Sequence, residues 1–252
     1  MSLEIGGRYN QHNEYGENFT YTITPSVNLT KAIKVFATAS SAFRAPTLSM
    51  LFGQYGANPD LKPELSVSYE AGATFNLFND QFKLRVVGFK RDMTDAIIYG
   101  NNGYINQDEQ KDKGLEIEPS VQLDRFDIKT YYAYVEGKQI AGTSISNFLL
   151  RRPKHTVGAN IGFKASENLY LSANYKFTGK RLDSDFSTYP AENKTLKAYQ
   201  LFDVYAAYTL KSKKTKLFVD LKNITNQKYT EMIGYKTMGF NLNVGASFSL
   251  NK

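Results

Sequence analysis

The chain has 252 residues, with no cysteine and no tryptophan, and its 31 lysines and arginines outnumber its 24 acidic residues. The absence of cysteine excludes a disulfide framework and a cysteine-ligated metal site. No run of about 18 consecutive apolar residues occurs, so no membrane-spanning helix is predicted. The basic residues are scattered along the chain, so we interpret them as solvated charges and expect no nucleic-acid partner.

Alternation of polar and apolar residues dominates the chain and predicts β-strands. The first three runs span residues 3–11, 19–30 and 32–43. In the second run Tyr21, Ile23, Val27 and Leu29 share one face, opposite a row of threonine, serine and asparagine. A period of two puts one apolar and one polar face on each strand.

A long connection, residues 44–65, follows the third run and reads RAPTLSMLFGQYGANPDLKPEL. A hairpin needs only a two-residue turn, so a loop of this length in a compact domain is usually functional or disordered. Its bulky aromatic residues argue against disorder. We expect Arg44 and Glu64, at its two ends, to have a structural role, with Glu64 pairing with Arg44 or Lys62.

Nine further strands are predicted, at 66–78, 81–92, 112–123, 125–137, 155–164, 167–178, 199–210, 214–224 and 238–250. Very short connections alternate with longer ones, which lie at 12–18, 44–65, 93–111, 138–154, 179–198 and 225–237. An up-and-down meander with short turns at one end and long loops at the other produces this alternation. Outer-membrane barrels are built in this way.

These patterns predict an all-β fold, a transmembrane antiparallel up-and-down β-barrel of about 12 strands. A soluble β-sandwich is the alternative, because its strands also alternate. Strands of about 10–12 residues, longer than the usual 5–6, favour the barrel, as do aromatic residues near the strand ends. We expect the polar faces to share one lumen. We also expect the first strand to pair with the last, because closure removes two unpaired edges.

Three motifs resemble the TonB-dependent outer-membrane receptors. The opening loop, FRAPTLSMLFGQYGANPDLKPE, is similar to the family's signature loop, and the next strand supplies the expected Glu70 and Gly72. Two later elements of the family also have counterparts here. One is Asn106 followed by KGLE at residues 113–116, and the other is NITNQKY at residues 223–229, which precedes the last predicted strand. The resemblance implies that residues 1–252 form the C-terminal part of a barrel of about 22 strands. The plug domain and the early strands would then be absent.

Within that family, the sequence most resembles the vitamin B12 (cobalamin) receptor branch. The segments that carry it are LLRRPKHT (149–156), TGKRLDSDFSTYP (178–190) and MIGYKTMGFNLNVGASFSL (232–250). This implies TonB-dependent uptake of cobalamin or a related corrinoid, with an iron–siderophore or haem as the alternative cargo. The implied partners are outer-membrane lipid, the large chelate itself, TonB acting through the missing plug, and a surface lipoprotein.

Four candidate substrate-binding residues lie in the long loops: Arg151, Phe186, Tyr189 and Tyr235. An arginine offers several fixed donors for amide and phosphate oxygens, although a charge at a barrel rim can also be merely solvated. We expect the neighbouring Arg152 to matter less. The aromatic rings provide either a flat platform for a macrocycle or anchors at the membrane interface. The resemblance favours Arg151 and Phe186, and more weakly Tyr235.

Enzyme chemistry has little support in the sequence. Only two histidines occur, His12 and His155, and no G-x-S-x-G motif is present, so we predict no catalytic residues. No phosphate-binding glycine loop or zinc spacing occurs, and we predict neither a metal site nor a cofactor. Asp183 and Asp185 form a D-x-D pair that could bind a cation, but a solvated turn is the simpler interpretation.

Overall fold

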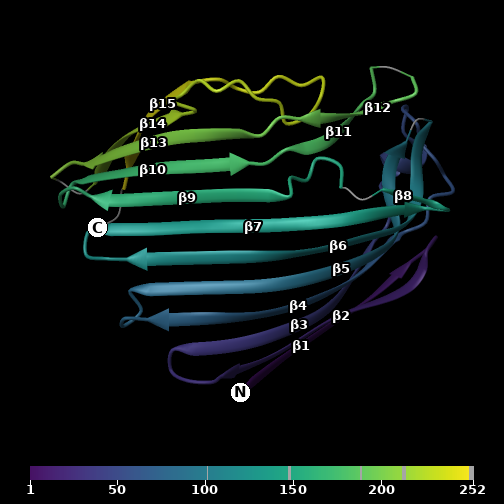
Figure 1. The fold of residues 1–252 in the computed structure, drawn as a ribbon, viewed down its shortest axis with the longest axis horizontal. Coiled ribbons are helices and arrows are strands. Elements are labelled where there is room, and N and C mark those ends of the chain that lie inside the picture. Colours follow the sequence, from purple (N-terminus) through teal and green to yellow (C-terminus); the bar gives the residue numbers. More distant parts are fainter. Residues whose placement is uncertain (101, 147–148, 188, 212–213, 250–252) are drawn as a thin grey trace.

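One curved antiparallel sheet makes up most of the computed structural model, which describes residues 1–100, 102–146, 149–187, 189–211 and 214–249 (Figure 1). Its strands follow one another in chain order. They are β1 (Ser2–His12), β2 (Gly16–Asn28), β3 (Ile33–Arg44), β4 (Glu64–Leu77), β5 (Phe82–Gly100), β6 (Gly103–Gln122), β7 (Phe126–Ala141), β9 (His155–Lys164), β10 (Leu169–Thr178), β13 (Tyr199–Thr209), β14 (Thr215–Lys222) and β15 (Asn241–Phe248).

The remaining elements are small. They are the five-residue helix α1 (Leu48–Phe52), the strand β8 (Ser144–Ser146) beside β7, and the hairpin of β11 (Arg181–Asp185) and β12 (Glu192–Leu196). Within the described residues, no helix has the length and apolar character needed to cross a membrane. Each of the twelve predicted strands is confirmed by one strand of the main sheet, although some strand ends lie several residues from their predicted positions.

Two of the predicted long connections are wrong, because the strands pair further than the alternation suggests. The ladder of β1 and β2 continues to His12 and Gly16, so the predicted loop at 12–18 is a short turn. The ladder of β5 and β6 continues to Gly100 and Gly103, so most of 93–111 is strand. Gly16 and Gly103 have φ values of +70° and +123°, which only glycine adopts readily, and this lets the chain reverse tightly.

Two other long connections carry strands of their own. The 138–154 connection begins with the last residues of β7 and includes β8, and the 179–198 connection contains the hairpin of β11 and β12. This hairpin forms a separate two-stranded sheet at the long-loop end of the main sheet (Figure 1). Pairing within a connection satisfies backbone groups that a structureless loop would have to leave to water.

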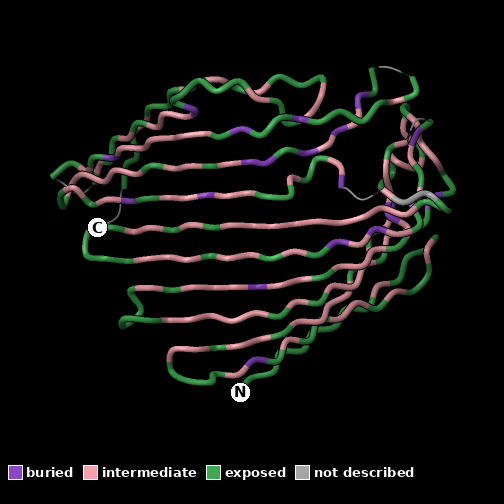
Figure 2. Tube along the Cα trace, viewed as in Figure 1, coloured by how far each residue is buried: buried purple, intermediate pink, exposed green. Residues whose placement is uncertain are grey.

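The apolar faces of the strands are not covered by a second sheet. Tyr69 is 52% exposed and Phe248 is 71% exposed, and Figure 2 shows only scattered buried residues along the strands. A sandwich would bury these side chains between two layers. The polar alternate faces, such as Ser68 and Glu70 of β4, lie on the opposite side of the same sheet. The arrangement is that of a barrel wall, and the sandwich alternative is wrong for the described residues.

The sheet is open, so the predicted pairing of the first strand with the last is wrong. β1 pairs only with β2, and β15 pairs only with β14, among the described residues. Leu3 and Ile5 on the β1 edge are 57% and 68% exposed. Strand tilt and curvature are linked to strand number in a barrel, so strands shaped for a wider barrel resist closing into a smaller one.

The long opening connection packs against the extended hairpin of β5 and β6. Glu64 forms an ion pair with Arg44 and accepts a hydrogen bond from the Ile97 amide at 2.6 Å. Asn58 donates from its side chain to the Tyr104 carbonyl at 3.0 Å, and the Tyr104 amide donates to Gly56 at 2.7 Å. The structural role expected for Arg44 and Glu64 is thus confirmed, and the loop is ordered by its neighbours.

Candidate functional site

Residues from three separate connections meet at the carboxylate of Asp183 on β11. Arg151 donates from Nε to Asp183 Oδ1 at 2.6 Å, and the Ile233 amide donates to Oδ2 at 2.8 Å. The Arg151 amide also donates to the Leu182 carbonyl at 2.7 Å. Asp183 therefore links the 149–154 and 225–240 segments to the β11–β12 hairpin. We call these three segments the loop cluster.

Asp183 is fully buried and stays ionised because of these contacts. Burial acts to raise the pKa of Asp183, but the Ile233 amide, the Arg151 guanidinium and the Ser184 amide together hold it below its ordinary value. Arg151 has a φ of +61°, a backbone conformation that is costly for a residue with a side chain and persists only where its surroundings impose it. Its bonds to Asp183 and Leu182 supply that constraint.

Asp185, the second aspartate of β11, is held by the hairpin itself. Lys194 donates to Asp185 Oδ2 at 2.6 Å across the hairpin, and Ser187 donates to Oδ1 from its hydroxyl at 2.6 Å and its amide at 2.9 Å. Lys194 and Ser187 hold the pKa of Asp185 well below its usual range. The exposures of Asp183 and Asp185 are 0% and 6%, so the interpretation of D-x-D as a solvated turn is wrong.

These carboxylates are engaged by amides and cations of the protein itself. No group of three or more metal-ligating residues that could hold an ion occurs in the part of the chain that the structure describes. Asp183 therefore holds separate loops together, and Asp185 holds its own hairpin together. Their sequence signal, two aspartates at i and i+2, does not distinguish this role from a surface turn.

The 225–240 segment has a second attachment to the hairpin and to β13. Arg181 donates to the Thr230 carbonyl at 2.5 Å and stacks over the Tyr199 ring at 5.2 Å. Tyr199 donates to Glu231 at 2.8 Å, and its ring lies 4.4 Å from that of Tyr229. Asp183 and these aromatic contacts together fix the segment that carries Tyr235.

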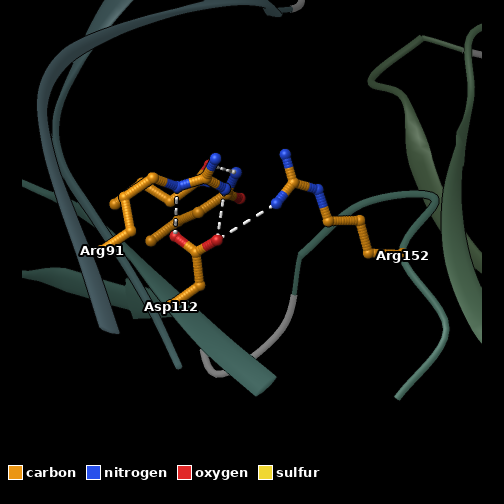
Figure 3. Close-up of polar contacts among 5 residues, drawn as sticks. Arg91, Asp112 and Arg152 are labelled. Atoms are coloured by element: carbon orange, nitrogen blue, oxygen red, sulfur yellow. Dashed lines mark hydrogen bonds and ion pairs between the residues drawn. The ribbon is translucent and has the colours of Figure 1, made fainter. Parts of the chain in front are cut away.

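Arg152 points away from Asp183 and into a different ion cluster. It donates to Asp112 Oδ2 at 3.1 Å, and Arg91 holds the same carboxylate through two nitrogens (Figure 3). The Asp112 side chain is only 1% exposed. The ladder of β5 and β6 places Arg91 directly opposite Asp112, which is why a pair so far apart in sequence meets. Sequence spacing alone carried no sign of this pairing.

A cavity of about 380 Å³ lies beside this second cluster on the polar face of the sheet. Arg91, Asp112 and Arg152 line it together with Glu70 and Glu116. None of the four predicted binding residues lines this cavity. The two neighbouring arginines therefore serve two different places, with Arg151 in the loop cluster and Arg152 at the wall.

The three predicted aromatic residues lie in the loop cluster and are exposed. Phe186 is 47% exposed, and its ring meets that of Tyr99 edge-on at 5.8 Å. Tyr189 is 79% exposed and Tyr235 is 71% exposed. Among the described residues no ring contact joins these three to one another. The three rings and the Arg151 guanidinium, whose side chain is 42% exposed, are thus all accessible on the loop cluster.

The family can be decided by comparison with known proteins. Residues 1–224 match the profile described as "TonB dependent receptor-like, beta-barrel". The chain belongs to this family. The barrels of this family lie in the outer membrane of Gram-negative bacteria. The members of the family are receptors and transporters rather than enzymes.

Solved structures of TonB-dependent receptors have the same fold as this chain. The ferric enterobactin receptor of Pseudomonas aeruginosa is 18% identical, with a TM-score of 0.76 over 98% of this chain and 43% of that one. The FrpB iron transporter of Neisseria meningitidis is 16% identical, with a TM-score of 0.74 over 98% and 42%. The ferric-catecholate receptor Fiu of E. coli K12 is 15% identical, with a TM-score of 0.73 over 92% and 35%. The chain thus spans well under half of the length of these receptors.

Proposed function

We propose that this chain is the C-terminal barrel portion of a TonB-dependent receptor that imports cobalamin or a related corrinoid. The observation that carries the proposal is the meeting of three segments at Asp183. Arg151, Asp183 and Ile233 come from the three segments whose sequences resemble the cobalamin receptor branch. Residues that recognise one ligand have to be brought together from different loops, and a shared buried carboxylate does this.

Arg151 is the proposed donor to the cargo. Its described contacts engage Nε and the backbone amide, and its side chain remains 42% exposed. The terminal guanidinium nitrogens are thus available to amide or phosphate oxygens of a corrinoid, and Phe186, Tyr189 and Tyr235 would contact its flat surfaces. TonB, acting through a plug domain, and a surface lipoprotein are the proposed protein partners.

A second candidate cargo is an iron–siderophore. The solved receptors described above include one for ferric enterobactin and one for ferric catecholates, which are also large chelates. At 15–18% identity these similarities support the fold of the chain, whereas the loop motifs support cobalamin. Equilibrium binding of cyanocobalamin and of ferric enterobactin to the complete receptor separates the two. Tight binding of ferric enterobactin with no binding of cyanocobalamin would reverse the proposal.

Substitution of Arg151 tests the site itself. Loss of a donor to a desolvated acceptor costs about 1–3 kcal/mol, so Arg151→Ala should weaken cyanocobalamin binding by roughly 5- to 150-fold. Because Arg151 also anchors the loop cluster, Asp183→Asn is the matched control, as it releases the anchor and keeps the guanidinium. Binding should fall further in Arg151→Ala than in Asp183→Asn, and Arg152→Ala should have the smallest effect. Equal binding by Arg151→Ala and the wild type would remove Arg151 from the site.

A further inference from the structure

The Phe186 ring is in contact with a ring that comes from a distant strand. It meets the Tyr99 ring edge-on, with the ring centroids 5.8 Å apart and an angle of 82° between the ring planes. Tyr99 lies near the end of β5, and Phe186 directly follows β11. In the order of the sheet, β7 and β9 separate β6 from β10, the strand that leads into the β11–β12 hairpin. The contact therefore joins the tip of the β5–β6 hairpin to the β11–β12 hairpin across two intervening strands.

The long opening connection packs against Tyr99 as well. A Cβ atom at Gly56 would lie 2.8 Å from the Tyr99 hydroxyl oxygen and 3.0 Å from Tyr99 Cε2, so the ring lies directly against the backbone of the connection. Tyr104, the ladder partner of Tyr99, meets it edge-on at 5.0 Å and an angle of 89°. Hydrogen bonds to Tyr104 from Asn58 and to Gly56 from Tyr104 fix the connection at this place. Tyr99 is thus confined by neighbours that are themselves held.

The orientation of the Phe186 ring depends on this contact. Phe186 is 47% exposed, so burial alone does not fix its ring. The backbone beside it is held where Asp185 accepts from Lys194 and from the Ser187 amide, but these bonds leave the Phe186 side chain free to turn. Among the described residues, Tyr99 supplies the one ring contact to Phe186. An edge-to-face pair has a preferred geometry, so it restricts the ring that it engages.

From these contacts we propose that Tyr99 is a positioning residue for the cargo, because it holds the Phe186 ring in the orientation in which that ring meets the cargo. The inference rests on the proposed function of Phe186 as a cargo contact. A ring that is already held loses less rotational freedom when the cargo binds, and this favours binding. Tyr99 acts through Phe186, so its effect on affinity should disappear when the Phe186 ring is removed.

A double-mutant cycle in the complete receptor tests this dependence, with cyanocobalamin as the probe. An aromatic pair contributes about 2- to 12-fold to an equilibrium, so Tyr99→Leu should weaken cyanocobalamin binding by about this factor. Tyr99→Phe keeps the ring and should bind like the wild type. Phe186→Leu and Tyr99→Leu/Phe186→Leu should bind equally, because the second change removes a support whose object is already gone. Multiplied effects in the double variant, or unchanged binding by Tyr99→Leu, would overturn the proposal.

Amide exchange at Ser187 without cargo tests the support itself. The Ser187 amide donates to Asp185 Oδ1 at 2.9 Å beside Phe186, and its exchange should be about 2- to 12-fold faster in Tyr99→Leu and unchanged in Tyr99→Phe. Tyr208→Leu is the matched control, since Tyr208 is 42% exposed, close to the 43% of Tyr99, and lies at the short-turn end of β13; it should change neither binding nor exchange. If the wild type does not bind cyanocobalamin, the proposed function fails and the exchange still decides whether Tyr99 holds Phe186. Unchanged exchange at Ser187 in Tyr99→Leu would show that Tyr99 is no support for this ring.

Discussion

Replacement of Asp183 by asparagine should open the loop cluster without unfolding the sheet. The ionised carboxylate accepts from Arg151 at one oxygen and from the Ile233 amide at the other. An asparagine side chain accepts at one atom only and presents an NH2 group at the other. One of the two donors must then lose its partner, and the 225–240 segment or the 149–154 segment is released.

The size of the effect follows from burial on the two sides of the contact. A hydrogen bond to a charged group contributes about 1.5–3 kcal/mol, and breaking a fully buried ion pair costs about 3–5 kcal/mol. Asp183 is 0% exposed, but the Arg151 side chain is 42% exposed and can return to water, which reduces the cost. We therefore expect local stability to fall by about 2–3 kcal/mol, with the sheet unaffected.

Amide hydrogen exchange at Ile233, followed by mass spectrometry of the complete receptor, measures this opening. A loss of 2–3 kcal/mol corresponds to exchange that is about 30- to 150-fold faster. Asp185→Asn is the matched control, because its main partner, Lys194, lies on the same hairpin, and exchange at Ile233 should change little. Unchanged protection of the Ile233 amide in Asp183→Asn would refute the assignment of Asp183 as the link between the loops.

Three further predictions concern pH and packing. The pKa of Asp183 is lowered in the folded protein, so its contribution to the stability of the loop cluster is present above the unfolded pKa of about 3.9 and is lost as the pH falls toward the folded pKa. Amide exchange at Ile233, corrected for the intrinsic exchange rate, should therefore rise below about pH 4. Asn223→Ala should lower the free energy of unfolding by about 2–3 kcal/mol, because the Asn223 side chain, which is 4% exposed, donates to the Gln227 carbonyl and accepts from the Gln227 amide. Unfolding in denaturant followed by circular dichroism measures this loss, and an unchanged midpoint would contradict the prediction. Gly103→Ala should loosen the tip of β5 and β6, because its Cβ would lie 2.4 Å from the Gly56 carbonyl oxygen; limited proteolysis there should speed up, and an unaltered cleavage rate would count against this packing.

The strand content and the faces of the strands were predictable from the sequence alone. Alternation of residue types is a local property that follows directly from the two-residue period of a strand. The positions of twelve strands and the apolar face that carries Tyr69 therefore emerge from reading the chain, whereas the motif residue Asn106 came from the resemblance to a family. The candidate residues Arg151, Phe186, Tyr189 and Tyr235 came from resemblance, and their binding role stays a prediction.

Only the tertiary structure decided the features that depend on strand register and on contacts between distant loops. Arg91 meets Asp112 because the register of the β5–β6 ladder places the two residues directly opposite each other. Asp183, taken from sequence for a solvated turn, is buried because a segment 50 residues later supplies its second donor. The open edges at β1 and β15 likewise reflect the curvature of the whole sheet. Local pattern specifies which side of a strand is apolar, whereas burial of a charge and closure of a sheet depend on atoms that the chain brings together only after folding.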